Sequence, residues 1–353
     1  MLTSPLSNYR LKNIAQVTII GGLIGITAGY ITSILDELEP MGPIIRGFLI
    51  AGLIGFHMGF FEEVIFNLKL RKASYIKLLL IRTIYYSATI LFWLISINVI
   101  SLTIEFGTPL GQTIRHYVVE DSFRRDSAII VIFLFILISL LQIRRLHSQG
   151  NLTKFILGVY HKPKETDRIF LFLDLKSSTS IAEKLGNIEY SNFLIDYFYD
   201  ITDAVLMADA EIYQYVGDEI ILTWPLSKGI DDAKSINCFF DIKNSIGLLK
   251  DKYLTRYGVY PEFKAGLHGG KVVATWIGDI KKEIVYHGDV LNTASRLESE
   301  CNRYNESLLI SEFILNNVEL PKYLEAEFKD ELQLRGKKNK IKIYSLNYLQ
   351  SKL

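Results

Sequence analysis

Two aspartates occupy positions where an acidic side chain is costly unless something binds it. Asp174 lies near the end of the apolar run 169–175, which has the length of a strand, and Asp218 follows Gly217 at the tip of a hairpin expected over 210–224. A carboxylate at the end of a buried strand needs a partner, and hard divalent cations bind such oxygens while keeping room for phosphate ligands. The pair therefore favours metal-assisted phosphate chemistry. Asp174 as a helix cap and Asp218 as a turn stabiliser would explain the same residues.

A second polar pair lies further along the chain, in the segment "GDVLNTASRLE". Asn292 and Arg296 are four residues apart in a stretch with helical periodicity, so both lie on one face of the expected helix. An amide next to a permanent cation can orient a sugar and neutralise the charge that develops on a transferring phosphate. An ordinary solvent-facing Asn and Arg are the alternative interpretation.

The elements that must position these residues follow from hydrophobic periodicity. From residue 169 onward the pattern predicts a strand, two helices, a hairpin, a helix, a hairpin, a strand, a helix and a strand. This order is typical of an α+β domain with helices on one face of a mainly antiparallel sheet. We expect this domain to cover 169–353.

The preceding part of the chain has a different composition. Hydrophobic residues make up 49% of the whole sequence, and the excess lies almost entirely before about residue 145. A membrane-spanning helix needs about 20 mostly apolar residues. We expect an all-α membrane bundle over 1–146 and a linker over 147–168. Four stretches approach or exceed the required length: Ile14–Leu35, Ile44–Ile65, Leu78–Ile104 and Ala128–Ile143.

The distribution of Lys and Arg around these stretches predicts the orientation. Basic residues precede the first span, lie in the second loop and follow the fourth span. This distribution predicts that both termini are in the cytoplasm. Arg115 in the third loop, with its two basic neighbours Arg124 and Arg125, weakens this assignment. We expect a multi-pass protein of the cell's inner (plasma) membrane with a cytoplasmic soluble domain.

Several residues within the spans allow two interpretations each. The glycines of "GGLIGITAG" either permit close helix contact or reflect the frequency of Gly in membrane helices. His57 and Glu62 either bind a ligand or proton, or are a packed polar residue and an interface marker, which we favour. Arg82 is expected to extend its side chain to the membrane interface.

Charge and cysteine content exclude other classes of protein. The net charge is +1 and no basic stripe is visible, so we expect no nucleic-acid partner. Cys238 and Cys301 are too few and too far apart for a disulfide framework or a zinc site, and we interpret them as core or surface thiols.

Taken together, the motifs from Arg168 to Leu346 resemble those of the class III nucleotidyl cyclases, the adenylate and guanylate cyclases. The resemblance depends on five segments in order: "FLFLDLKSST", "YQYVGDEI", "AGLHGGKV", "GDVLNTASRLE" and "LQLRGKKNKIKIYSL". It implies a ferredoxin-like, palm-like α+β domain that converts ATP to 3',5'-cyclic AMP and pyrophosphate for signalling.

The resemblance also implies roles for individual residues. Asp174 and Asp218, with the carbonyl of Leu175, would hold two Mg²⁺ or Mn²⁺ ions. Asn292 would position the ribose and Arg296 would stabilise the charge on the α-phosphate. The triphosphate would contact the turn and a distal basic residue: Ser177, Ser178, Thr179 and Arg335. In this family the metal pair and the Asn–Arg helix of one site come from different chains, which implies a homodimer with composite active sites.

Two positions depart from the family pattern at the base. Gln214 lies in an expected strand that otherwise looks buried. It stands where adenylate cyclases usually have Lys and guanylate cyclases Glu, and its amide can offer either a donor or an acceptor. Val285 replaces the usual Asp or Thr, and Ser178 replaces the Phe of the metal-loop motif. We favour ATP, with GTP as the alternative. A diguanylate cyclase is a poorer interpretation, because that family lacks the Asn–Arg helix. A catalytically inactive cyclase-like membrane receptor is also a poorer one, because all four site residues are present.

Overall fold

The structure is a computed structural model, and the chain divides into two compact units, 1–146 and 147–353. The described residues are 5–35, 37, 39–70, 75–107, 109–119, 159–278, 282–333 and 340–349, with Ile132, Phe135 and Ile138 as isolated positions between 120 and 158.

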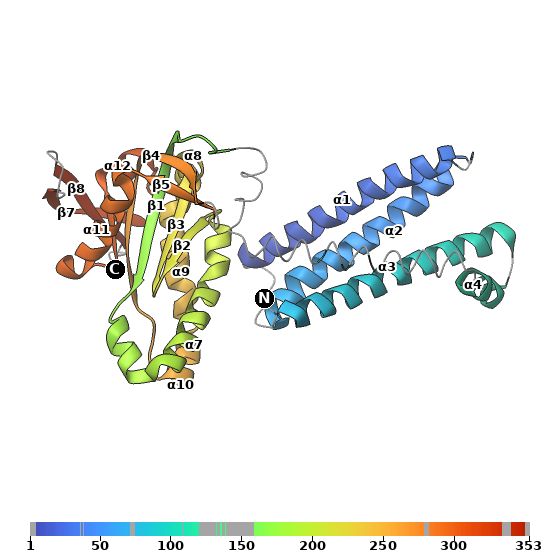
Figure 1. The fold of residues 1–353 in the computed structure, drawn as a ribbon, viewed down its shortest axis with the longest axis horizontal. Helices are drawn as coiled ribbons and strands as arrows, with labels where there is room; N and C mark the ends of the chain where they lie inside the picture. The colour runs from blue at the N-terminus through green and yellow to red at the C-terminus, as the bar shows by residue number, and fades with distance from the viewer. Residues whose placement is uncertain are drawn as a thin grey trace. The chain divides into compact units, whose positions relative to one another are not determined.

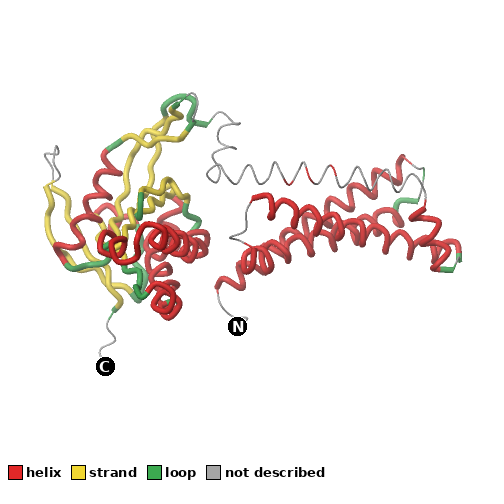
Figure 2. Tube along the Cα trace, turned by 60° about the horizontal axis from the view of Figure 1, so that its bottom comes forward, coloured by secondary structure: helices red, strands yellow, loops and turns green. Residues whose placement is uncertain are grey.

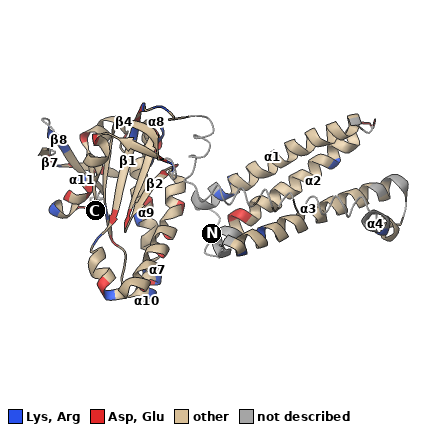
Figure 3. Ribbon diagram, viewed as in Figure 1, with Lys and Arg blue, Asp and Glu red and all other residues tan. Residues whose placement is uncertain are grey.

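The first unit is helical (Figures 1 and 2). Its elements are α1 (Pro5–Leu35), α2 (Met41–Phe60), the π-helix η1 (Phe61–Leu70), α3 (Tyr75–Phe106) and α4 (Leu110–Val119). Figure 3 shows almost no charged residues along α1, α2 and α3. Within the described residues, three segments are long and apolar enough to cross a membrane: Arg10–Ile34, Met41–Ile65 and Ile76–Ser101.

These three segments agree with the first three spans expected from the sequence. The fourth, Ala128–Ile143, lies outside the described residues apart from the three isolated positions. The count of four spans therefore stays a prediction. The helical, apolar character of the first unit is confirmed.

Glycines bring α1 and α2 into backbone contact. A Cβ atom added at Gly25 would clash with the carbonyl oxygen of Gly47, and one added at Gly29 would clash with the carbonyl of Pro43. Gly55 on α2 faces the carbonyl oxygen of Val17 in the same way. Because only Gly permits this approach, close packing is the correct interpretation of the glycine-rich first span.

We expect Gly25→Ala to lower the melting temperature of the helical unit by several degrees, since overpacking costs about 1–3 kcal/mol. The measurement is thermal unfolding of the full chain in detergent, followed by circular dichroism at the helix band. Gly52→Ala is the matched control, because its added Cβ would meet nothing nearer than the Cα of Gly22 at 3.9 Å. Equal melting temperatures for the two variants would contradict the role of Gly25 in packing.

A polar cluster lies between α2/η1 and α3. Arg82 is 4% exposed, and its Nη2 lies 3.0 Å from Oε2 of Glu62. The other carboxylate oxygen, Oε1, accepts a hydrogen bond from the Tyr86 hydroxyl at 2.5 Å. Glu62 is thus an ion-pair partner of Arg82 within the helical unit, because a buried guanidinium requires a counter-charge. The depth of this pair relative to the membrane interface stays a prediction. The ring centroid of His57 lies 5.8 Å from that of Trp93, as expected for a packed residue.

The second unit is built on an eight-stranded sheet. Its path is β2-β3-β1-β4-β6-β8-β7, with β5 paired to β4, and β4–β6 is the one parallel pair among the described strands. The mainly antiparallel sheet agrees with the α+β prediction. The strands are β1 (Lys164–Leu175), β2 (Glu211–Val216), β3 (Glu219–Pro225), β4 (Phe263–Ile277), β5 (Glu283–His287), β6 (Leu308–Ser311), β7 (Leu324–Gln333) and β8 (Lys340–Tyr348).

The helices of this unit connect those strands. The two helices expected after β1 form one element, α7, interrupted at Gly186, where φ is 76° and the backbone is not helical. The elements are α7 (Ser178–Met207), α8 (Leu226–Ile230), the 3₁₀-helix η2 (Asp231–Ala233), α9 (Lys234–Leu248), α10 (Lys250–Tyr257), α11 (Asp289–Tyr304) and α12 (Glu312–Asn317). The predicted ending of strand, helix and strand is wrong: α11, β6, α12 and the β7–β8 hairpin follow β5.

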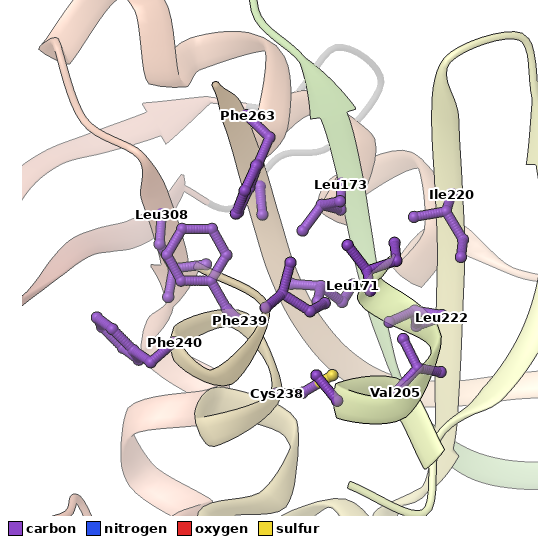
Figure 4. Packing of buried hydrophobic residues seen from close by; sticks show 14 of the residues in the cluster. Leu171, Leu173, Val205, Ile220, Leu222, Cys238, Phe239, Phe240, Phe263 and Leu308 are labelled. Atoms are coloured by element: carbon purple, nitrogen blue, oxygen red, sulfur yellow. The ribbon is translucent and has the colours of Figure 1, made fainter. Parts of the chain in front are cut away.

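Alternate residues of β1 pack on opposite faces of the sheet. Leu171 and Leu173 join the large core formed with α7 and α9, part of which Figure 4 shows. Phe170 contributes to a second cluster that includes Val290 and Ala294 of α11. The expectation of helices on one face is therefore wrong, since α11 covers the other face. Both faces of β1 are apolar, so its sequence is a continuous hydrophobic run rather than an alternating one.

Both cysteines are buried and free. Burial raises the pKa of the Cys238 thiol far above its ordinary value and that of Cys301 to about 12, so neither forms a thiolate near neutral pH. They are core residues, one of the two positions expected for them.

Candidate active site

Strand register brings Asp174 and Asp218 together. Leu173 on β1 pairs with Ile220 on β3, so the next residue of β1, Asp174, lies level with the turn that carries Asp218. Gly217 allows this tight turn because its φ of 65° is in the left-handed region, which residues with a Cβ rarely adopt. The two aspartates expected from the sequence to form one site are thus neighbours in space.

The electrostatics of this pair are those of an acidic cluster. Burial, followed by repulsion from Asp218 and Glu298, raises the pKa of Asp174 to about 6. Oδ2 of Asp218 is buried and has no hydrogen-bond partner within the described part of the chain. A buried carboxylate oxygen without a partner is costly, and a bound cation would satisfy it.

Three further charged residues belong to this cluster and were not singled out in the sequence. Burial, followed by repulsion from Glu298, Asp174 and Asp218, raises the pKa of Glu219 to about 7. Lys264 pairs with Asp174 across the β1–β4 ladder. Glu219 follows Asp218 directly and was visible in the sequence. Lys264 and Glu298 join the cluster through strand pairing and helix packing, for which the sequence carries no local signal.

The cluster fits divalent cations. Among the described residues, no three His, Cys, Asp or Glu side chains converge in a metal-binding arrangement, so main-chain oxygen, water and substrate phosphate would have to complete the coordination of the aspartates. Asp174 and Asp218 provide the hard oxygen ligands that Mg²⁺ and Mn²⁺ prefer. The carbonyl of Leu175, next to Asp174 at the end of β1, is a further oxygen at the expected position.

The N-terminus of α7 follows the strand that carries Asp174. Ser177, with φ of 57°, precedes the helix, which begins at Ser178, so the first N–H groups of Ser178 and Thr179 have no partner within the helix. Such a terminus favours phosphate. The turn is held by the N–H of Lys176, which donates to the carbonyl of Glu262 at 2.8 Å, and by a hydrogen bond between the side chains of Ser178 and Tyr190.

Asn292 and Arg296 both lie on α11, as predicted. Asn292 is exposed and Arg296 is half-buried. Asp174 lies near the end of β1 and Asp218 in the turn between β2 and β3, whereas Asn292 and Arg296 lie on α11. By element, the site residues therefore form two groups, one around β1 and β3 and one on α11.

The two base-contact candidates lie on β2 and β5, which β3, β1 and β4 separate in the sheet. Gln214 is exposed on β2, an edge strand whose pairing with β3 is irregular between Ile212 and Gln214. The expectation that this strand is buried is wrong. Val285 lies half-buried on β5, and the rings of the adjacent residues Tyr213 and Tyr286 are 5.3 Å apart. Arg335 lies outside the described residues.

Comparison with known proteins agrees with this geometry. Residues 159–348 match the adenylate and guanylate cyclase catalytic domain, more than half of the chain. The chain belongs to this cyclase family. Similar relatives include adenylate cyclase 2 of Rhizobium meliloti (strain 1021), 37% identical over 60% of this chain and 58% of the relative, and human retinal guanylyl cyclase 2, 31% identical over 51% of this chain and 16% of the relative.

A solved structure has a similar fold to this chain. A bacterial light-regulated adenylyl cyclase aligns with a TM-score of 0.54 at 18% identity, covering 65% of this chain and 67% of that chain. The predicted fold class, a helical apolar region followed by an α+β cyclase domain, is confirmed. The chain spans little more than half of the adenylate cyclase 2 sequence and a smaller share of the retinal cyclase.

The raised carboxyl pKa values predict how metal binding depends on pH. In the metal-free fold Asp174 and Glu219 hold protons that the unfolded chain releases, so stability falls as the pH rises through about 6 to 7. Divalent cations need the ionised carboxylates. We therefore expect Mn²⁺ to raise the melting temperature by several degrees at pH 8 and hardly at pH 5. Trp224, fully buried in the core, reports the transition by fluorescence. A shift of equal size at both pH values would contradict the assignment.

Proposed function

We propose that this chain is a membrane-bound adenylate cyclase that converts ATP to 3',5'-cyclic AMP and pyrophosphate. The observation that carries the proposal is the Asp174–Asp218 pair, in which one buried carboxylate oxygen of Asp218 has no partner in the described residues. Family membership and the phosphate-compatible start of α7 support the same reaction.

The active site is proposed to be composite. The metal-binding residues lie on β1 and the turn before β3, the nucleotide-binding pair lies on α11, and each chain carries both. A homodimer in which the aspartates of one chain face Asn292 and Arg296 of the other would form two equivalent sites.

In this site the side chains have distinct tasks. Asp174 and Asp218, with the Leu175 carbonyl, would hold two Mg²⁺ or Mn²⁺ ions, which when bound acidify the ribose 3'-hydroxyl and neutralise phosphate charge. Asn292 hydrogen-bonds the ribose and fixes its orientation. Arg296 stabilises the charge on the α-phosphate as pyrophosphate leaves. The first N–H groups of α7, at Ser178 and Thr179, bind the triphosphate, and Ser177 shapes the turn before them. Arg335 is assigned to the phosphates by resemblance.

The choice of ATP over GTP has weaker support than the reaction itself. The Rhizobium relative is named an adenylate cyclase and the human relative a guanylyl cyclase. Gln214 can donate to adenine N1 or accept from the guanine N1–H, and Val285 cannot hydrogen-bond a base. We favour ATP because identity to the adenylate cyclase is higher and extends over more of this chain.

Product analysis of the purified full chain tests reaction and base together. ATP and GTP are offered separately with Mg²⁺ or Mn²⁺, and cyclic AMP, cyclic GMP and pyrophosphate are quantified. We expect cyclic AMP to exceed cyclic GMP at least about tenfold, a difference of about 1.4 kcal/mol in transition-state binding. A larger yield of cyclic GMP would make the chain a guanylate cyclase. If neither nucleotide gives a cyclic product, the chain is instead a catalytically inactive, cyclase-like membrane receptor.

The proposed location is the inner (plasma) membrane, with several spans and a cytoplasmic catalytic unit where ATP is available. The three apolar helices of suitable length and the basic residues of the flanks, such as Arg10 and Lys12, support this arrangement. No nucleic-acid partner is proposed.

A further inference from the structure

One buried lysine connects the two groups of site residues within a single chain. Nζ of Lys264 on β4 lies 3.5 Å from Oδ2 of Asp174 and 2.5 Å from Oε1 of Glu298. The side chains of Lys264 and Glu298 are only 11% and 7% exposed. Glu298 follows Arg296 by two residues on α11. Lys264 thus contacts a proposed metal ligand on one side and the helix of the nucleotide-binding residues on the other.

The ammonium group of the lysine lies between two carboxylates, within ion-pair distance of both Asp174 and Glu298. Removing one partner from such a buried arrangement is strongly destabilising, because the remaining charges are left unpaired in a medium of low dielectric constant.

The helix that carries Glu298 is held tightly against β4 at the same place. A Cβ atom added at Gly266 would clash with the backbone of Ala294 and of Glu298, and Sγ of Cys301 lies 3.2 Å from the carbonyl of Ala265. The ion pair between Lys264 and Glu298 therefore lies at the point where α11, which carries Asn292 and Arg296, is in backbone contact with β4.

We propose that Lys264 is a positioning residue shared by two half-sites, the metal half-site around Asp174 and the helix half-site of Asn292 and Arg296. It offsets part of the negative charge at Asp174, and it anchors α11 through its ion pair with Glu298. This inference rests on the proposed composite site, in which these two half-sites of one chain serve different active sites of the dimer. The side chain of Lys264 would then link metal capture in one site with nucleotide positioning in the other.

Opposite effects on metal affinity test the first role. In Lys264→Met the cation beside Asp174 is gone, so Mn²⁺ is expected to bind about tenfold more tightly. In Glu298→Gln the lysine has only Asp174 left of its two carboxylates and competes with the metal, so Mn²⁺ should bind about tenfold more weakly. The double variant should return close to wild type. The measurement is free Mn²⁺ by electron paramagnetic resonance on the full chain in detergent at pH 8.5, where the cluster is ionised.

Defined heterodimers test the second role. Paired with an Arg296→Ala chain, a Lys264→Met chain can contribute only its helix to the one complete site, and kcat should fall at least about tenfold because Glu298 is left unpaired. Paired with an Asp218→Ala chain, it contributes only its metal half, and kcat should stay within about threefold while less Mn²⁺ is required. Lys264→Arg should restore kcat in the first heterodimer.

Lys329→Met is the matched control, since Lys329 is 15% exposed and paired with Glu306 at 2.8 Å and Glu327 at 2.7 Å. It should change neither Mn²⁺ affinity nor kcat. Shifts of Mn²⁺ affinity in the same direction for Lys264→Met and Glu298→Gln, or no shift in either, would overturn the inference. A wild-type chain that binds no Mn²⁺, or an inactive Asp218→Ala and Arg296→Ala heterodimer, would instead count against the proposed function.

Discussion

Asp218→Ala is expected to reduce cyclic nucleotide formation at least about 10³-fold, because loss of the metal site removes several kcal/mol of transition-state stabilisation. The same substitution should leave the fold intact. It removes a buried oxygen that has no partner in the described residues, and it relieves the repulsion that raises the pKa of Asp174. The melting temperature of the metal-free variant should therefore equal or exceed that of the wild type.

Turnover with ATP and Mn²⁺, thermal unfolding and oligomeric state, all on the full chain, provide the measurement. Asp209→Ala is the control, since Asp209 is 56% exposed and pairs with Lys234 on the surface. A surface pair of this kind contributes at most about 1 kcal/mol to stability and should leave turnover unchanged. Turnover at the wild-type level in Asp218→Ala would contradict the two-metal assignment. A lower melting temperature would show that Asp218 stabilises the turn rather than holding a metal.

A mixture of two inactive variants is expected to recover activity. Asp218→Ala lacks the metal half-site and Arg296→Ala lacks the helix half-site, so a heterodimer contains one complete site and one site with both defects. The heterodimer should show about half the wild-type kcat, since one of two equivalent sites is restored, whereas each homodimer should fall at least about 10²-fold. Co-expression with two affinity tags isolates the heterodimer for the measurement.

The reference for this experiment is the heterodimer of wild-type and Asp218→Ala/Arg296→Ala chains. In that dimer each site contains one defective half, so no activity should appear. Activity there, or none in a verified Asp218→Ala and Arg296→Ala heterodimer, would show that each chain completes its own site.

The correct expectations from the sequence concern features that depend on neighbouring residues. The apolar run of β1 ending at Asp174, the Gly217 turn and the spacing of Asn292 and Arg296 each follow from strand length, turn chemistry or helical period. The three described apolar helices follow from length and hydropathy in the same way.

The expectations that failed concern packing between distant segments. The pairing of Arg82 with Glu62 on another helix was not expected from the sequence. Gln214 was expected on a buried strand, but β2 is at the edge of the sheet. Helices were expected on one face, but α11 covers the other. Apolar periodicity shows that a face is buried, and does not show which element covers it.

By itself, the sequence determined the family, the order of most elements and the residues proposed to bind metal and nucleotide, because these are encoded in local spacing. Only the tertiary structure decided that Lys264 lies between Asp174 and Glu298, and that a buried oxygen of Asp218 faces no partner within the described residues. The physical reason is that strand register and helix docking join residues far apart in the chain, and the energy of a buried charge depends on which neighbours they bring.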